Sequence, residues 1–184
     1  MTTSHRIEAD LLLPGDGEPV VDGCVVVDDG VITYAGPKAL APPTPAAPTV
    51  RTPVVMPGMW DSHCHLFGIV AANLQHLATD AVPLRAMRIG RDVERALGAG
   101  FTSLREVGGL GVHLARAIAE GTVVGPEIYA AGALLSTTGG HGDIHSLPEA
   151  FVATCERFHD LELCDGVPEC LRAVRRQLRR GARV

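Results

Sequence analysis

The sequence predicts an α/β protein in which parallel strands alternate with helices, preceded by a small β unit. Residues 6–36 read as short strands joined by tight turns. Residues 41–48, APPTPAAP, form a proline-rich connector that can continue neither a helix nor a central strand. From residue 50 onward, strand-like and helix-like segments alternate three times, as in folds built from parallel strands and covering helices.

The first segment contains a β-hairpin signal. The pair Asp29-Gly30 lies between the apolar runs CVVVD and VITYAG, and glycine accepts the positive φ that a two-residue hairpin turn requires. We therefore expect a first domain over residues 1–50, a β unit with its connector. A second domain over residues 51–184 would hold the strand–helix pairs.

The second domain opens with TPVVMPGMWDSHCH, which we expect to be one strand and its exit. A helix over 83–100 follows, with Ile89, Val93 and Leu97 at fourfold spacing. The later segments, in order, are a strand (101–109), a helix (112–121), a strand, or a strand broken at Gly132, that leads into a glycine-rich loop (127–143), and a helix with one apolar stripe (167–181). Three such pairs imply right-handed crossovers, so the loops after the strands gather at one end of the sheet, where active sites form in these folds.

A pair of histidines follows the first of these apolar runs. His63 and His65 flank Cys64, and side chains alternate along a strand, so the two imidazoles face one side and the thiol faces the other. Two imidazoles that lie two residues apart on the same face of a strand can bind one metal ion. A helix would place them about 200° apart, so the spacing favours metal binding only on a strand.

Composition excludes several classes of partner. The net charge of −5 and the 4% aromatic content argue against nucleic acid and against anionic membranes as partners. No apolar run approaches the ~18 residues of a membrane span. The N-terminus lacks a signal-peptide pattern, and the five cysteines show no CxxC spacing. We therefore expect a cytoplasmic protein with reduced thiols. The arginine-rich face of the last helix is expected to face water rather than to bind a membrane or nucleic acid.

Three motifs together resemble the metal-dependent amidohydrolase superfamily, within it the imidazolonepropionase-like and Xaa-Pro dipeptidase-like branch. They are PG-x-x-D-x-H-x-H after an apolar run, GAGFTSLREVGG, and GPEIYAAGALLSTTGGHGD. The resemblance spans about residues 7 to 184. It implies a (β/α)8 TIM-type barrel flanked by a β-sandwich, so residues 1–50 would be part of that sandwich. Residues 51–184 would be the first part of the barrel, about three of its β/α units.

The resemblance also implies a chemistry and a set of site residues. His63 and His65 would be metal ligands for a divalent ion, most often zinc, with one or two ions in the intact site. Metal-activated water would then cleave an amide or peptide-like C–N bond of a small-molecule or dipeptide-like substrate. Asp61 would support the pair without binding metal. His141 would bind the substrate, for example through a carboxylate; a solvent-exposed loop histidine is the alternative, and His145 is a weaker candidate for the same role.

The remaining ligands of the family cannot be assigned in this sequence. The family's bridging lysine, two further histidines and general acid/base aspartate belong to later strands, and Lys38, the one lysine here, lies in the β unit. The catalytic residue is therefore unknown and expected beyond the C-terminus. We expect an incomplete, inactive portion of a hydrolase that needs a missing C-terminal half or a homo-oligomer. The alternative is a non-catalytic fragment or partner-binding module.

Overall fold

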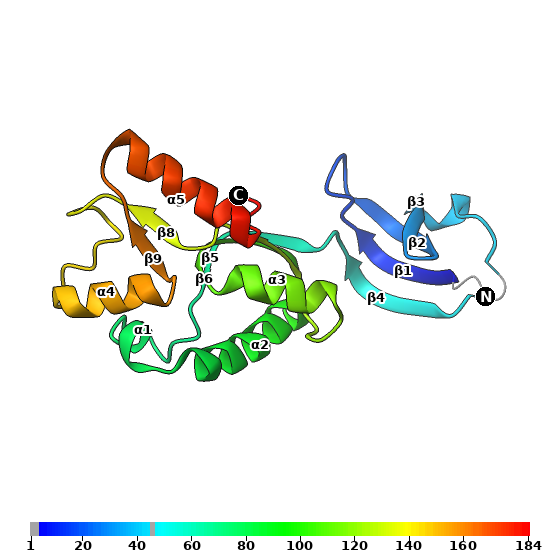
Figure 1. Ribbon diagram of the computed structural model, residues 1–184. Coiled ribbons are helices and arrows are strands. Elements are labelled where there is room, and N and C mark those ends of the chain that lie inside the picture. Colours follow the sequence, from blue (N-terminus) through cyan, green and yellow to red (C-terminus); the bar gives the residue numbers. More distant parts are fainter. Residues whose placement is uncertain (1–3, 45–46) are drawn as a thin grey trace. The chain divides into compact units, whose positions relative to one another are not determined.

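The structure is a computed structural model that describes residues 4–44 and 47–184 (Figure 1). It divides the chain into two compact units, Met1–Pro57 and Gly58–Val184. Within the described ranges, no helix is both long enough and apolar enough to cross a membrane. Of the proline-rich connector, residues 45 and 46 lie outside the described residues.

The first unit contains one four-stranded sheet in the order β3-β2-β1-β4. Its elements are β1 (Ser4–Leu12), β2 (Val20–Asp28), β3 (Val31–Pro37), the 3-10 helix η1 (Lys38–Leu40) and β4 (Thr49–Val55). The expected hairpin is confirmed: β2 and β3 pair antiparallel, and both Asp29 (φ 49°) and Gly30 (φ 80°) take positive φ in the turn. Strand β4 adds to the sheet parallel to β1.

The single strand expected over TPVVMPGMWDSHCH is wrong, because the segment forms two strands in different sheets. Strand β4 pairs with β1 in the first unit, whereas the histidines lie on β5 (Met59–Leu66) in the second. Pro57 lacks the N–H that a continuous ladder needs. Gly58 lies so close to Thr102 that an added Cβ would sit 2.1 Å from its hydroxyl oxygen. The chain therefore changes sheets here.

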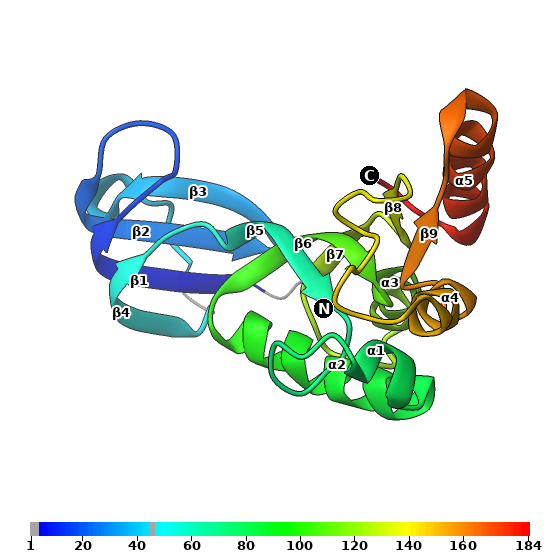
Figure 2. The ribbon, with the colours of Figure 1, turned by 90° about the vertical axis from the view of Figure 1, so that its left-hand side faces the viewer.

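The second unit is built on three parallel strands in the order β5-β6-β7 (Figure 2). Its other elements are α1 (His76–Thr79), α2 (Val82–Gly98), β6 (Phe101–Gly109), α3 (Gly111–Ala119), β7 (Glu127–Ala130), β8 (Leu134–Ser136), α4 (Glu149–Arg157), β9 (Leu161–Leu163) and α5 (Gly166–Arg180). Strands β8 and β9 form a separate parallel pair. The expected α/β class with parallel strands is confirmed, but the described strands form open sheets, not a closed barrel.

The core of the second unit lies between the sheet and helices α2 and α3. Ile89 and Val93 of α2 and Leu114 of α3 pack with Leu104 of β6 and Ile128 of β7, and all five are buried. Ile89 and Val93 belong to the stripe that the sequence predicted for this helix. Burial of this stripe fixes the face that α2 turns toward the sheet.

Helix α5 presents its apolar stripe to solvent. Its buried side chains are Ala173 and Gln177, and the Gln177 Oε1 accepts a hydrogen bond from the Ala133 N–H at 3.1 Å. The stripe itself is exposed: Val167 72%, Leu171 50%, Val174 45% and Leu178 60%. A row of apolar side chains this exposed is typical of an interaction surface.

A buried ion pair joins α2 to the segment before β9. Arg85 and Asp160 are 0% and 1% exposed, and the guanidinium donates two hydrogen bonds to the carboxylate, one of them at 2.8 Å. Arg85 also donates to the carbonyl oxygens of Phe67 at 2.8 Å and Leu77 at 3.2 Å. Through this one side chain, α2 is joined to the exit of β5, to α1 and to a segment 75 residues further along the chain.

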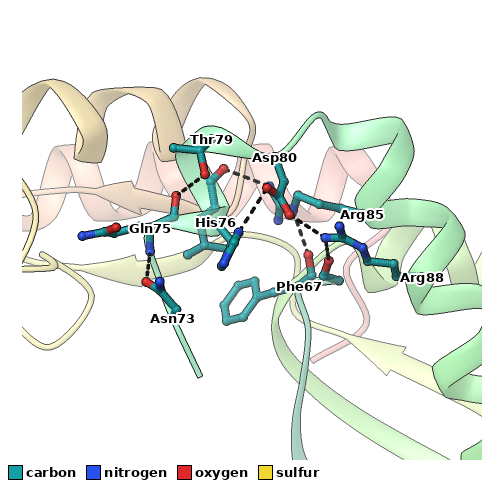
Figure 3. Close-up of polar contacts among 10 residues, drawn as sticks. Phe67, Asn73, Gln75, His76, Thr79, Asp80, Arg85 and Arg88 are labelled. Carbon is teal, nitrogen blue, oxygen red and sulfur yellow. Dashed lines mark hydrogen bonds and ion pairs between the residues drawn. The ribbon is translucent and has the colours of Figure 1, made fainter. Parts of the chain in front are cut away.

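A second arginine, one helical turn along α2, holds the same loop. Figure 3 shows Arg85 and Arg88 beside the chain at Phe67, with Asp80 joined to Arg88 and to His76. The Arg88 guanidinium donates to the Gly68 carbonyl at 3.2 Å. Gly68 has φ 67°, and a Cβ there would lie 2.2 Å from the Arg85 carbonyl oxygen, so this position requires glycine.

Glu106, near the end of β6, is a buried carboxyl group that has no cationic partner among residues 4–44 and 47–184. It is 0% exposed, its Oε1 accepts the Gly111 N–H at 3.4 Å, and its Oε2 has no hydrogen-bond partner. Burial raises the pKa of Glu106 from its usual 4.5 to about 7, against backbone hydrogen bonds that lower it. The neutral form therefore suits this position.

Breaking the Arg85–Asp160 pair should destabilise the second unit strongly. Arg85→Met leaves a buried carboxylate without its partner, and such changes cost about 3–5 kcal/mol. The double variant Arg85→Met/Asp160→Leu removes both charges and should recover most of that loss. Urea unfolding of the wild type, both single variants and the double variant measures the coupling; additive losses would contradict it.

Glu106 should make stability fall as pH rises. Because its folded pKa lies above its unfolded pKa, the folded protein keeps a proton that the unfolded chain has lost between pH 4.5 and about 7. The free energy of unfolding should decrease over this range by up to about 3 kcal/mol. Glu106→Gln should remove this dependence in urea unfolding at pH 5 and pH 8. The exposed Glu94→Gln is the control, and an unchanged pH dependence in Glu106→Gln would contradict the assignment.

Candidate functional site

The two histidines lie on one side of β5, as the strand alternation predicts. The ring centroids of His63 and His65 are 5.3 Å apart, with the planes at 73°. Zinc binds histidine nitrogen at about 2.0–2.1 Å in tetrahedral geometry, which places two ligand rings about 5 Å apart, centre to centre. Both side chains are exposed. The spacing of the pair therefore fits a single metal ion.

The orientation of His65 is supported from two sides. Its Nδ1 lies 3.2 Å from the Gly108 carbonyl oxygen, and its ring stacks on Phe67 with centroids 5.0 Å apart and planes at 8°. A carbonyl accepts only from a protonated nitrogen, so this contact selects the tautomer whose Nε2 has a free lone pair. Histidines that bind metals commonly donate their other nitrogen in this way.

The neighbours of the pair have structural contacts of their own. The Cys64 thiol donates to the Arg105 carbonyl at 3.6 Å and packs against the core, and burial raises its pKa to about 12. A thiol in this environment stays protonated and is a poor metal ligand. The Asp61 carboxylate accepts the His63 N–H at 3.0 Å, so it holds the backbone of the pair.

His141 lies in a loop after β8 that hydrogen bonds hold in place. The Gly139 N–H donates to the Asp143 carboxylate at 2.8 Å, and the Gly142 N–H donates to the Ser136 hydroxyl at 3.0 Å. A Cβ at Gly142 would lie 2.1 Å from Leu134 Cδ2. The glycines therefore let the loop pack closely and fix the position from which His141 projects.

One cavity of about 190 Å³ is lined both by His65 of β5 and by His141 of the loop after β8. The sequence placed these two residues at separate strand exits, and the fold puts them on one cavity. His63 does not line this cavity, and His145 lies instead on a more open hollow beside His141. His141 is therefore placed better than His145 for a role beside the pair.

No third ligand completes the histidine pair among the described residues. Within residues 4–44 and 47–184, no group of three or more His, Cys, Asp or Glu side chains is arranged to hold a metal ion. Lys38 belongs to the first unit, where it pairs with Glu8 at 2.9 Å. Two imidazoles are a suitable but partial ligand set, since zinc sites use three or four protein ligands.

Sequence reasoning missed several residues that support the site. Phe67 could have been found, because it follows His65 by two positions and strand alternation places it on the same face. Gly108, Arg85 and Asp160 gave no such signal. Their contacts join residues 43 and 75 positions apart, and no local pattern encodes those pairings.

Comparison with known proteins identifies relatives. The sequence profile of the Amidohydrolase family matches residues 54–184. Ochratoxinase of Aspergillus niger is 41% identical over 194 residues, covering 97% of this chain and 40% of that enzyme. The ochratoxinase crystal structure superposes with a TM-score of 0.87 at 38% identity, over 99% of this chain and 46% of the solved one. A prolidase solved with N-methylphosphonate-L-proline superposes with a TM-score of 0.80 at 31% identity, over 98% and 45% of the two chains.

The family match covers most of the chain, and it includes the strand with the histidine pair and the loop with His141. The chain nevertheless spans less than half the length of the relatives named above. The resemblance seen in the sequence motifs is therefore confirmed: this chain belongs to the amidohydrolase family, and it is related to ochratoxinase and to prolidases.

Proposed function

We propose that this chain supplies the first two metal ligands of a hydrolase that cleaves an amide or peptide-like C–N bond in a small molecule. The observation that carries the proposal is the geometry of His63 and His65. Their spacing fits one ion, and the contact of His65 with Gly108 leaves one ring nitrogen free to bind it. Relatives named ochratoxinase and prolidase support a hydrolase that acts on such small substrates.

The residues of this chain would have distinct tasks in that reaction. His63 and His65 would hold a divalent ion, most often zinc in this family. When bound, such an ion supplies Lewis acidity toward a carbonyl oxygen and a water molecule. His141, which lines the same cavity as His65, would donate a hydrogen bond to a substrate carboxylate. No residue here is assigned as the general acid/base.

The exposed stripe of α5 supports the view that turnover needs more than this chain. Val167, Leu171, Val174 and Leu178 are exposed on one face, and the relatives are more than twice as long as the matched region. The occupant we propose for this surface is the part of the relatives that this chain does not span, which the family resemblance implies to be the rest of a barrel. A second copy of the chain is the alternative partner. A non-catalytic role as a binding module is the second candidate function, favoured by the two-ligand site.

Zinc binding and a chimera test the proposed function. The isolated chain should bind one Zn²⁺ weakly, because only two ligands are present, and His63→Ala/His65→Ala should reduce the affinity at least tenfold. Calorimetric titration measures both. A chimera that joins residues 1–184 to the part of Aspergillus niger ochratoxinase beyond the matched region should hydrolyse the substrate of that enzyme.

The same double substitution should abolish hydrolysis by the chimera while leaving it folded. Ser62→Ala, beside the pair on β5, is the matched control and should keep both metal binding and activity. A folded chimera whose hydrolysis does not depend on His63 and His65 would overturn the proposal. A folded, zinc-binding chimera without hydrolysis would favour the binding-module alternative.

The α5 surface makes a separate prediction for the isolated chain. Leu171→Glu/Leu178→Glu should lower self-association in analytical ultracentrifugation and the binding of a dye that reports apolar surface, because it places charges within the exposed stripe. Arg172→Gln/Arg179→Gln lowers the net charge by the same two units elsewhere on the helix and should leave dye binding unchanged. Equal effects of the two pairs would show that net charge, rather than the stripe, controls association.

A further inference from the structure

Two cysteines are in contact where β9 passes into α5 (Figure 1). Cys164 directly follows β9, and Cys170 lies on α5, six residues further along the chain. The Cys170 thiol donates a hydrogen bond to the Cys164 carbonyl oxygen at 3.6 Å, and the two thiols also hydrogen-bond each other. Both are free thiols. The turn between β9 and α5 therefore brings two reduced sulfur atoms together.

The other three cysteines have different surroundings. Cys24 belongs to the first unit and is 0% exposed, and Cys155 is equally buried in the second unit. The Cys64 thiol donates to the Arg105 carbonyl oxygen. These three thiols have the environment of packing residues, whereas Cys164 and Cys170 each have a second thiol as a neighbour.

The two thiols of the pair differ in their access to solvent. Cys164 is 5% exposed, whereas Cys170 is only partly buried. Burial, and after it the hydrogen bond with Cys170, raises the pKa of the Cys164 thiol to about 11. The thiolate is the nucleophile in thiol–disulfide exchange, so Cys164 is a poor first reactant. Cys170 is therefore the thiol that a dissolved oxidant meets first.

Hydrogen bonds that involve neither sulfur atom hold the turn between the cysteines. The Asp165 N–H donates to the Glu169 carboxylate at 2.9 Å. The Asp165 carboxylate accepts the N–H and the hydroxyl of Thr138 at 3.1 and 2.6 Å. Gly166, at φ 72°, takes a backbone conformation that favours glycine. The fold therefore keeps the two thiols near each other before any oxidation.

The position of the pair determines what a bond between the sulfur atoms would restrain. The Cys164 N–H donates to the Ser136 carbonyl oxygen at 2.8 Å, which attaches Cys164 to the pair of strands β8 and β9. Cys170 precedes Leu171 of the exposed apolar stripe. A disulfide would therefore join this pair of strands covalently to the helix that carries the stripe.

We propose that Cys164 and Cys170 form a modification site, a dithiol that a small disulfide such as glutathione disulfide oxidises to an intrachain disulfide bond. The Cys170 thiolate attacks one sulfur of the oxidant, forms a mixed disulfide and releases one glutathione. The Cys164 sulfur then loses its proton to water, attacks the Cys170 sulfur and releases the second glutathione. The two protein thiols lose two electrons and two protons, and the oxidant gains them as two thiols. The proposed function does not depend on this site.

Peptide mapping by mass spectrometry tests the proposal, because the tryptic peptide 158–172 contains both cysteines and no other. The 184-residue chain is equilibrated with mixtures of reduced and oxidised glutathione, quenched with acid, alkylated and digested. As the oxidised fraction rises, this peptide should lose two hydrogens and take up no alkyl group, while the peptide with Cys155 stays alkylated. Two alkyl groups on peptide 158–172 at every mixture would overturn the proposal.

The same titration in concentrated urea separates the fold from closeness in the sequence. The equilibrium constant for disulfide formation should be about tenfold larger, or more, in the folded chain, because the turn already holds the thiols together. A constant in the folded chain that is equal to or smaller than that in urea would overturn the proposal, since the fold would then contribute nothing to the pairing.

Single substitutions test the order of the two steps. Cys164→Ser should stop the reaction at a mixed disulfide of Cys170 with glutathione, and Cys170→Ser should leave the buried Cys164 unmodified. Cys24→Ala, in the first unit, is the matched control and should form the disulfide as the wild type does. Circular dichroism checks that each variant is folded. Glutathione on Cys164 in folded Cys170→Ser, to the extent seen on Cys170 in Cys164→Ser, would overturn the proposed order of attack.

Discussion

The arrangement of the second unit depends on the buried pair of Arg85 and Asp160. Two opposite charges without solvent are stable only when their hydrogen-bonding groups are satisfied, and here the guanidinium donates to Asp160 and to the carbonyls of Phe67 and Leu77. The pair thereby ties α2, α1, the exit of β5 and the segment before β9 into one body. Because Phe67 stacks on His65 and Asp160 lines the cavity, the same contacts connect stability to the candidate site.

The candidate site illustrates how a partial ligand set can already be organised. His65 has a supported ring orientation, and the backbone of His63 is held by Asp61. These supports come from within the described unit and require no further ligand. Preorganisation lowers the cost of binding, so a metal ion or further ligands would meet side chains that are already in position.

The exposed apolar stripe of α5 is a second feature that is in position to bind a partner, here a protein surface rather than a metal ion. Elsewhere in the unit, apolar helix faces are buried: Ile89 and Val93 of α2 and Leu114 of α3 close over the sheet. Helix α5 buries Ala173 and Gln177 and exposes its larger apolar side chains. This chain spans less than half the length of its relatives.

The sequence by itself determined the α/β class, the hairpin at Asp29-Gly30 and the placement of His63 and His65 on one side of a strand. Each follows from a local rule, either turn chemistry or the two-residue period of a strand. Only the tertiary structure decided that β4 and β5 separate at Pro57-Gly58, that α5 exposes its stripe, and that His65 and His141 share a cavity. Those features depend on contacts between residues distant in sequence, such as Arg85 with Asp160. A local sequence pattern does not predict which distant residue a side chain will contact.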